Sequence, residues 1–195
     1  PVRADSQYSG ALLLVPSAFV PAALIGVLVL IGAAVWWLLI TTEGVYLGRR
    51  VVVWLYDVYA TRYDRIKQFD PEWEAETLST PLIAALTDTP APLILDVATG
   101  TGRLPALLYA DPNFSGHVVG VDASRQMLKQ AAGKLAGTAT ALIWAAAGDL
   151  PFPDATFDAV TCLEALEFTP NAARTLSELV RVARPGAVIL ITNRR

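Results

Sequence analysis

The longest apolar stretch of the chain lies near its beginning. Residues 11–40 are 30 consecutive residues without a charged side chain. About 20 apolar residues are enough for a helix to cross a bilayer, and two full spans would need more than this stretch contains. Pro21 suits the first turn of a helix, where its missing N–H needs no partner. We therefore predict one transmembrane helix over residues 21–42, preceded by a lead-in over residues 1–20.

The residues that flank this stretch predict its orientation. Trp36 and Trp37 lie near its end, as aromatic residues do at a membrane interface. Arg49 and Arg50 follow, whereas only Arg3 precedes the stretch, so the positive-inside rule predicts a single-pass membrane protein whose C-terminal domain is cytoplasmic. A cleaved signal peptide is the alternative, but its apolar region would be shorter.

Residues 43–90 have the pattern of several helices. The segment 45–59 is apolar and aromatic, so it lies either along the membrane surface or on the domain. Leu82, Ile83 and Leu86 have the spacing of the buried face of a helix. We predict juxtamembrane helices for this part of the chain.

From residue 91 onward, short apolar runs alternate with amphipathic segments. The runs predict strands over residues 93–97, 117–122, 139–146, 158–162 and 187–192. The last helix is expected over residues 171–184, with Leu176, Leu179, Val180 and Ala183 pointing inward. Such alternation implies right-handed crossovers and an α/β fold with a doubly wound parallel sheet, here in the order 3-2-1-4-5. Residues 91–195 are the predicted core.

Three carboxylates mark one edge of this predicted sheet. Asp96, Asp122 and Asp149 lie at or just beyond the ends of the first three strands, where open α/β sheets bind ligands. Gly100 and Gly102 allow the first turn to approach a ligand closely. The dinucleotide pattern G-x-G-x-x-G is absent, which argues against an NAD-dependent enzyme.

The first turn resembles a known family motif. Asp96-Val97-Ala98-Thr99-Gly100-Thr101-Gly102 resembles motif I of class I S-adenosylmethionine-dependent methyltransferases, with Ala98 in place of the first of three glycines. This variant resembles the ubiquinone/menaquinone C-methyltransferase branch (methyltransferase type 11). Residues 122–128 and 147–160 resemble the post-I motif and motif II of that family.

The resemblance implies S-adenosylmethionine as cofactor, with Asp122 on its ribose and Asp149 on its adenine. It also implies that residues 43–90 include helices that cover the cofactor, since the segment 59–64, which ends in Tyr63-Asp64, is similar to the covering helix of the family. An ordinary amphipathic helix is the alternative for this segment.

The implied cofactor-binding residues are Asp96, Ala98, Gly100, Gly102, Asp122, Ala123, Asp149, Leu150 and Leu163. The catalytic residue stays open, with Glu164, Glu167 and Tyr63 as candidates. We expect no metal cluster, because the chain has one cysteine and one histidine, and no nucleic-acid partner, because its net charge is −3.

Two functions therefore compete. The first is a membrane-anchored S-adenosylmethionine-dependent methyltransferase that acts on a small or lipid-soluble acceptor. The alternative is a non-catalytic methyltransferase-like subunit that binds other membrane subunits in a complex. The family normally adds a sixth strand and an antiparallel seventh, which the sequence up to Arg195 lacks. We expect that the gene continues, that a partner covers the sheet edge, or that this is a reduced form.

Overall fold

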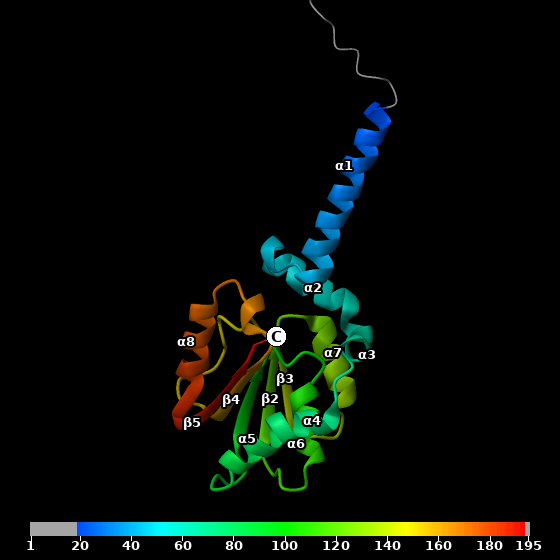
Figure 1. Cartoon of the computed structure of the whole chain (residues 1–195). Coiled ribbons are helices and arrows are strands. Elements are labelled where there is room, and N and C mark those ends of the chain that lie inside the picture. Colours follow the sequence, from blue (N-terminus) through cyan, green and yellow to red (C-terminus); the bar gives the residue numbers. More distant parts are fainter. Residues whose placement is uncertain (1–18, 194–195) are drawn as a thin grey trace, which may run out of the picture.

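A computed structural model describes residues 19–193, so most of the predicted lead-in lies outside the described residues. Five parallel strands form one sheet in the order β3-β2-β1-β4-β5, which confirms the predicted doubly wound sheet. The strands are β1 (Leu93–Val97), β2 (His117–Asp122), β3 (Thr140–Trp144), β4 (Phe157–Leu163) and β5 (Ala183–Thr192). Figure 1 shows that helices cover both faces of this sheet.

Most of the remaining described residues lie in helices. The N-terminal ones are α1 (Phe19–Trp36), η1 (Trp37–Thr41), η2 (Val45–Leu47), α2 (Arg49–Tyr59), η3 (Ala60–Arg62), α3 (Tyr63–Lys67), α4 (Pro71–Glu74), η4 (Ala75–Ser79) and α5 (Thr80–Ala85). Those within the sheet region are α6 (Arg103–Ala110), α7 (Arg125–Lys134), η5 (Leu166–Phe168) and α8 (Ala172–Val182). Side-chain oxygens of Asp70, Ser124 and Asn171 accept backbone N–H groups at the starts of α4, α7 and α8, as N-caps do.

The central strand β1 shows why the strands of this sheet appear in the sequence as runs of apolar residues. Leu95 and Val97 lie in a cluster with Leu179 of α8, whereas Ile94 points to the other face and lies in a cluster with Leu82 of α5. Because both faces are covered, every position of the strand favours an apolar residue. Asp96 is the exception within this buried strand.

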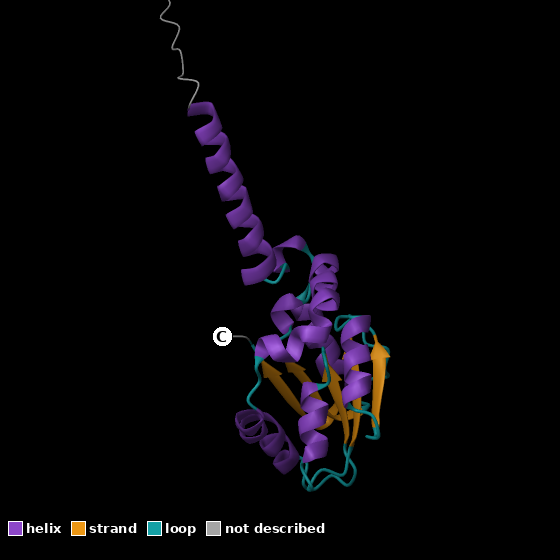
Figure 2. Cartoon of the chain, turned by 90° about the vertical axis from the view of Figure 1, so that its right-hand side faces the viewer, coloured by secondary structure: helices purple, strands orange, loops and turns teal. Residues whose placement is uncertain are grey.

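The helix α1 extends away from the rest of the described chain (Figure 2). Residues Ala23–Thr41 have a mean hydropathy of 2.7 and none of this span is buried in the structure. Its length and composition are sufficient for a membrane crossing, although a signal sequence near the N-terminus has the same properties. The predicted start at Pro21 lies two residues inside the observed helix.

Two carboxylates fasten the N-terminal helices to the sheet region. Asp57 of α2 accepts two hydrogen bonds at the start of α7. One comes from the Ser124 hydroxyl, and the other comes from the backbone N–H of Gln126 at 3.3 Å. Asp64 of α3 accepts a hydrogen bond from the Thr101 hydroxyl and lies 2.6 Å from Lys134 Nζ. These contacts hold α2 and α3 over the end of the sheet at which β1 and β2 finish.

Helix α8 corrects one part of the sequence prediction. Leu179 is fully buried, but Leu176 is 37% exposed and Val180 is 61% exposed, so their predicted inward orientation was wrong. The inward face is formed by Thr175, Leu179 and Val182, at the i, i+4, i+7 spacing. Because Thr175 is polar, the sequence pattern did not mark it as buried, and the inward face was assigned to the wrong positions.

The predicted boundaries of the last helix, of β5 and of β3 are also wrong. The helix ends at Val182 instead of residue 184, and β5 begins at Ala183 instead of residue 187. The pairing of β4 with β5 shifts register near the start of β5, where Gly186 adopts a φ of 84°. The third strand covers only residues 140–144. Ala145 and Ala146, expected in that strand, instead line a cavity beyond its end.

The face of α8 can be tested by two truncations. We expect Leu179→Ala to lower the free energy of unfolding by about 2–5 kcal/mol, because it leaves a cavity in the core. Val180→Ala should change it by less than about 0.5 kcal/mol, because that side chain is exposed. Urea unfolding of both variants in detergent checks this, and equal losses would contradict the assigned face.

Candidate functional site

The turn after β1 is built from left-handed residues. Ala98, Gly100 and Gly102 have φ values of 58°, 56° and 79°. A Cβ placed on Gly100 would meet no heavy atom within 4 Å, whereas one on Gly102 would lie 2.7 Å from Leu135 Cδ1. Gly100 therefore leaves open space for an approaching ligand, and Gly102 permits the close packing that involves Leu135, just beyond α7.

The end of β2 places a carboxylate beside this turn. Asp122 Oδ2 accepts the Gly100 N–H at 2.9 Å, and Oδ1 accepts the Ser124 N–H at 2.7 Å. Burial raises the pKa of Asp122 to about 6, despite these two hydrogen bonds. Each carboxylate oxygen has a second lone pair, so Asp122 can still accept hydrogen bonds from a ligand hydroxyl.

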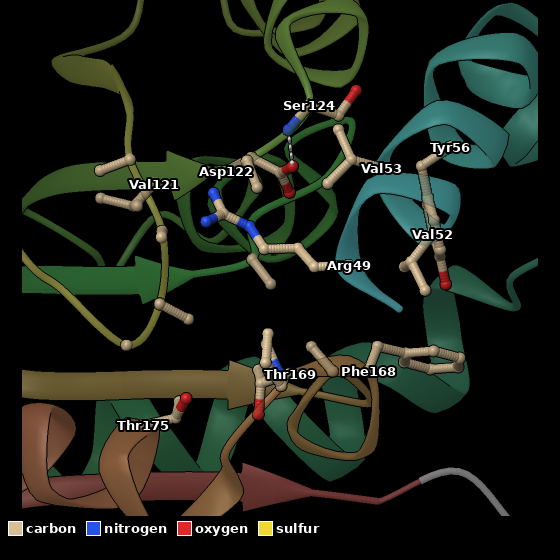
Figure 3. Close-up of a pocket in the computed structure, with 18 of the residues that line it drawn as sticks. Arg49, Val52, Val53, Tyr56, Val121, Asp122, Ser124, Phe168, Thr169 and Thr175 are labelled. Atoms are coloured by element: carbon tan, nitrogen blue, oxygen red, sulfur yellow. Dashed lines mark hydrogen bonds between the residues drawn. The ribbon is translucent and has the colours of Figure 1, made fainter. Parts of the chain in front are cut away.

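A cavity of about 510 Å³ lies at the carboxyl ends of the strands. Its walls come from α2, the turn after β1, the end of β2, the segment after β3 and the segment between β4 and α8 (Figure 3). The predicted site residues that line it are Tyr63, Ala98, Gly100, Asp122, Ala123, Asp149, Leu163 and Glu164. The sheet edge thus brings together residues that are far apart in the sequence.

The other predicted cofactor residues lie outside this cavity. Asp96 is buried, accepts the Thr161 hydroxyl at 2.6 Å and lines a smaller neighbouring cavity of about 40 Å³. Burial raises the pKa of Asp96. Leu150 is buried in the core, and its N–H donates to Glu178 at 2.8 Å. Gly102 has the packing role given above.

The catalytic candidates differ in their surroundings. Glu164 follows β4 in a left-handed conformation, with φ of 49°, and its carboxylate lies 3.5 Å from the Arg103 guanidinium. Tyr63 lines both cavities, and burial raises its pKa above the usual range, so its hydroxyl stays protonated at neutral pH. Glu167 lies in η5 and is not among the described residues that line either cavity. The geometry therefore singles out no strong base.

The sequence predicts a cofactor-covering helix at residues 59–64, but no residue of α2 was named from it as part of the site. Arg49, Val52, Val53 and Tyr56 line the large cavity, and Phe168 approaches Tyr56 edge-on with ring centroids 6.0 Å apart. Figure 3 shows the Arg49 side chain reaching toward Asp122. The amphipathic pattern of residues 45–59 was visible in the sequence, but it does not specify what the inner face covers.

The chemistry of these residues fits S-adenosylmethionine. Its ribose hydroxyls and adenine amino group are donors, and both Asp122 and Asp149 line the cavity and offer acceptors; the Asp149 side chain is largely exposed and lies 3.9 Å from the Arg174 guanidinium. The open space at Gly100 permits close approach of the ligand to the backbone. The cavity volume is within the range typical of small-molecule sites.

Comparison with known proteins agrees with this geometry. Residues 95–191 match the family model of a methyltransferase domain. The chain is 38% identical over 136 residues to a demethylmenaquinone methyltransferase from Symbiobacterium thermophilum, covering 68% of this chain and 54% of that protein. The domain formed by β1 to β5 belongs to the class I S-adenosylmethionine-dependent methyltransferases. The chain spans about half the length of the curated relatives it matches.

Solved structures place this methyltransferase domain among related folds. An S-adenosylmethionine-bound amino pentose methyltransferase from Micromonospora echinaspora is 27% identical, with a TM-score of 0.57, and the match covers 71% of this chain and 56% of that one. The cyclase SpnF has a TM-score of 0.63 at 21% identity, over 75% of this chain and 60% of that one, which shows the fold alone. S-adenosylmethionine is the cofactor of this family.

The left-handed Ala98 predicts a stabilising substitution. We expect Ala98→Gly to raise the free energy of unfolding by about 0.5–1 kcal/mol, because an L side chain is disfavoured at this φ. The matched change Ala106→Gly inside α6 should lower it by about 1 kcal/mol. Thermal or urea unfolding measures both, and a similar loss in the two variants would contradict strain at Ala98.

The raised pKa of Asp122 predicts a pH effect. The folded state holds the proton up to about pH 6, whereas the unfolded chain releases it near pH 4, so stability is lost as pH rises through this window. We expect wild type to lose about 1–3 kcal/mol relative to Asp122→Asn between pH 4 and pH 7. Urea unfolding of both proteins across this range measures the difference, and a constant difference would contradict the raised pKa.

Proposed function

We propose that this protein is a membrane-anchored methyltransferase that transfers a methyl group from S-adenosylmethionine to a small or lipid-soluble, quinone-type acceptor. The observation that carries the proposal is the shared cavity. Asp122 and Asp149 line it, and so does α2, which is joined by the short segment around η2 to the helix that is apolar enough to cross a membrane. The name of the relative, demethylmenaquinone methyltransferase, supports an acceptor of the quinone class.

Different cavity residues would bind different parts of S-adenosylmethionine. Asp122 would accept hydrogen bonds from the ribose hydroxyls, and Asp149 would accept one from the adenine amino group. Ala98, Gly100 and Asp96 would hold the methionine end, where the turn leaves open space. When bound, S-adenosylmethionine supplies a methyl group on a positively charged sulfur, which a nucleophilic acceptor atom can attack. The protein's contribution is positioning and a dry site.

The side of the cavity formed by α2 suits an apolar acceptor. Val52 and Val53 of α2, with Tyr56 and Phe168, give this side of the cavity an apolar and aromatic lining. We assign no base, because Arg103 pairs with Glu164 and Tyr63 remains protonated. An acceptor whose own hydroxyl is acidic would not need a strong one.

The orientation of the anchor follows from the flanking charges. Helix α1 would cross the membrane once, and Arg49 and Arg50 would keep the methyltransferase domain on the cytoplasmic side. An acceptor dissolved in the bilayer would then lie on the same side of the cavity as α2.

Binding of the cofactor is the primary test. We expect titration calorimetry of the full chain in detergent to give micromolar affinity for S-adenosylmethionine. Asp122→Asn should weaken it by about 10- to 100-fold, because charge-assisted hydrogen bonds contribute about 1.5–3 kcal/mol. Asp88→Asn, an exposed position before β1, is the matched control and should leave the affinity unchanged.

Transfer is then measured with radiolabelled cofactor and a demethylated naphthoquinone in vesicles. Label found in the quinone supports the proposed acceptor class. Binding without transfer to any quinone would remove the quinone assignment. A folded chain that does not bind the cofactor would overturn the enzyme and favour a non-catalytic subunit of a membrane complex.

A further inference from the structure

The outer face of α2 is exposed and carries large apolar side chains. Trp54 is 57% exposed and Val58 is 55% exposed, although Val52 and Leu55 on the opposite face are buried. Arg50 is also exposed, and Arg50, Trp54 and Val58 follow one another at four-residue intervals on the helix. We call these three residues the α2 surface.

The acidic side chains near α2 contact the protein and not the α2 surface. Asp57 accepts hydrogen bonds from Ser124 and Gln126, and so faces α7. Glu43 accepts a hydrogen bond from Tyr56 and pairs with Lys67 at 3.3 Å. The acidic groups near α2 are thus engaged with the protein, and the α2 surface itself combines an arginine with two apolar side chains. This combination matches the interface of an anionic bilayer.

The position of α2 relative to α1 is set by packed contacts. The Trp37 and Tyr46 rings are stacked, with centroids 5.8 Å apart. Gly44 lies in the segment that joins α1 to α2, residues 37–48, which we call the elbow. It has a φ of 75°, and a Cβ on it would lie 3.0 Å from Leu55 Cδ1, so the elbow packs directly against α2. Figures 1 and 2 both show α2 between the end of α1 and the sheet.

We propose that the α2 surface binds the anionic phospholipid headgroups of the bilayer that α1 enters. Arg50 contacts the phosphates, while Trp54 and Val58 enter the boundary between headgroups and acyl chains. The inner side of the same helix, with Arg49, Val52, Val53 and Tyr56, lines the cavity, so this contact holds the cavity at the membrane surface. The inference rests on α1 as a membrane span, which is part of the proposed function.

A fluorescent label on α2 tests this surface. Val58→Cys in the full chain is labelled with bimane, and Asn113→Cys, exposed in the loop before β2, is the control position. The native Cys162 is buried, and burial raises its thiol pKa to about 12, so it stays unlabelled. The labelled proteins are reconstituted in phosphatidylcholine vesicles with or without phosphatidylglycerol.

We expect the emission at position 58 to shift to shorter wavelength when phosphatidylglycerol is present, and brominated lipids to quench it. High salt and Arg50→Glu should reverse the shift. Lys129→Glu, which makes the same charge change on the exposed side of α7, should not. Emission at position 113 should be unchanged throughout.

Two readouts separate this inference from the proposed anchor. Flotation of the chain with vesicles at alkaline pH reports on α1. If the chain floats but position 58 remains water-exposed in both lipids, the α2 surface is rejected and the anchor stands. If the chain does not float, both are rejected. A shift that instead follows protein concentration in detergent would assign the surface to a second copy of the chain and overturn the proposal.

Discussion

The hydrogen bond from the Gly100 amide to Asp122 joins the ends of the two central strands, and the geometry of the cavity depends on it. The turn after β1 that carries this amide passes through three left-handed residues. Two of these are glycines, and the third, Ala98, adopts a conformation that is costly for an L residue. The same bond keeps a carboxylate at the cavity wall although burial raises its pKa.

A second set of contacts decides what closes the cavity. Asp57 and Asp64 are seven residues apart, and each accepts a hydrogen bond from a hydroxyl group of the sheet region. Together with the edge-on packing of Tyr56 against Phe168, these contacts hold α2 at the strand ends. With them, a helix from the N-terminal part of the chain becomes a wall of a site whose other residues come from the methyltransferase domain.

Much of this fold could be predicted from the sequence, and the exceptions have physical reasons. The strand positions follow from apolar runs, because both sheet faces are covered, and the three carboxylates follow from strand ends. The phase of α8 was misjudged because the buried stripe includes Thr175, which periodicity counts as polar. Gly102 and Leu150 belong to a motif, but only packing shows that one contacts Leu135 and the other lies in the core. Arg49 could not be placed, because its position depends on long-range contacts made by Asp57.

The packed elbow between α1 and α2 has a kinetic consequence. A catalytic domain on a flexible tether moves freely through solution. Here Gly44 packs against Leu55 and the Trp37 ring stacks on Tyr46, so a bilayer crossed by α1, as proposed above, would have this domain held close to its surface. Encounters with a lipid-dissolved acceptor would then occur in two dimensions. The relevant concentration would be the mole fraction of acceptor among lipids, so adding inert lipid would dilute the substrate even at constant total amount.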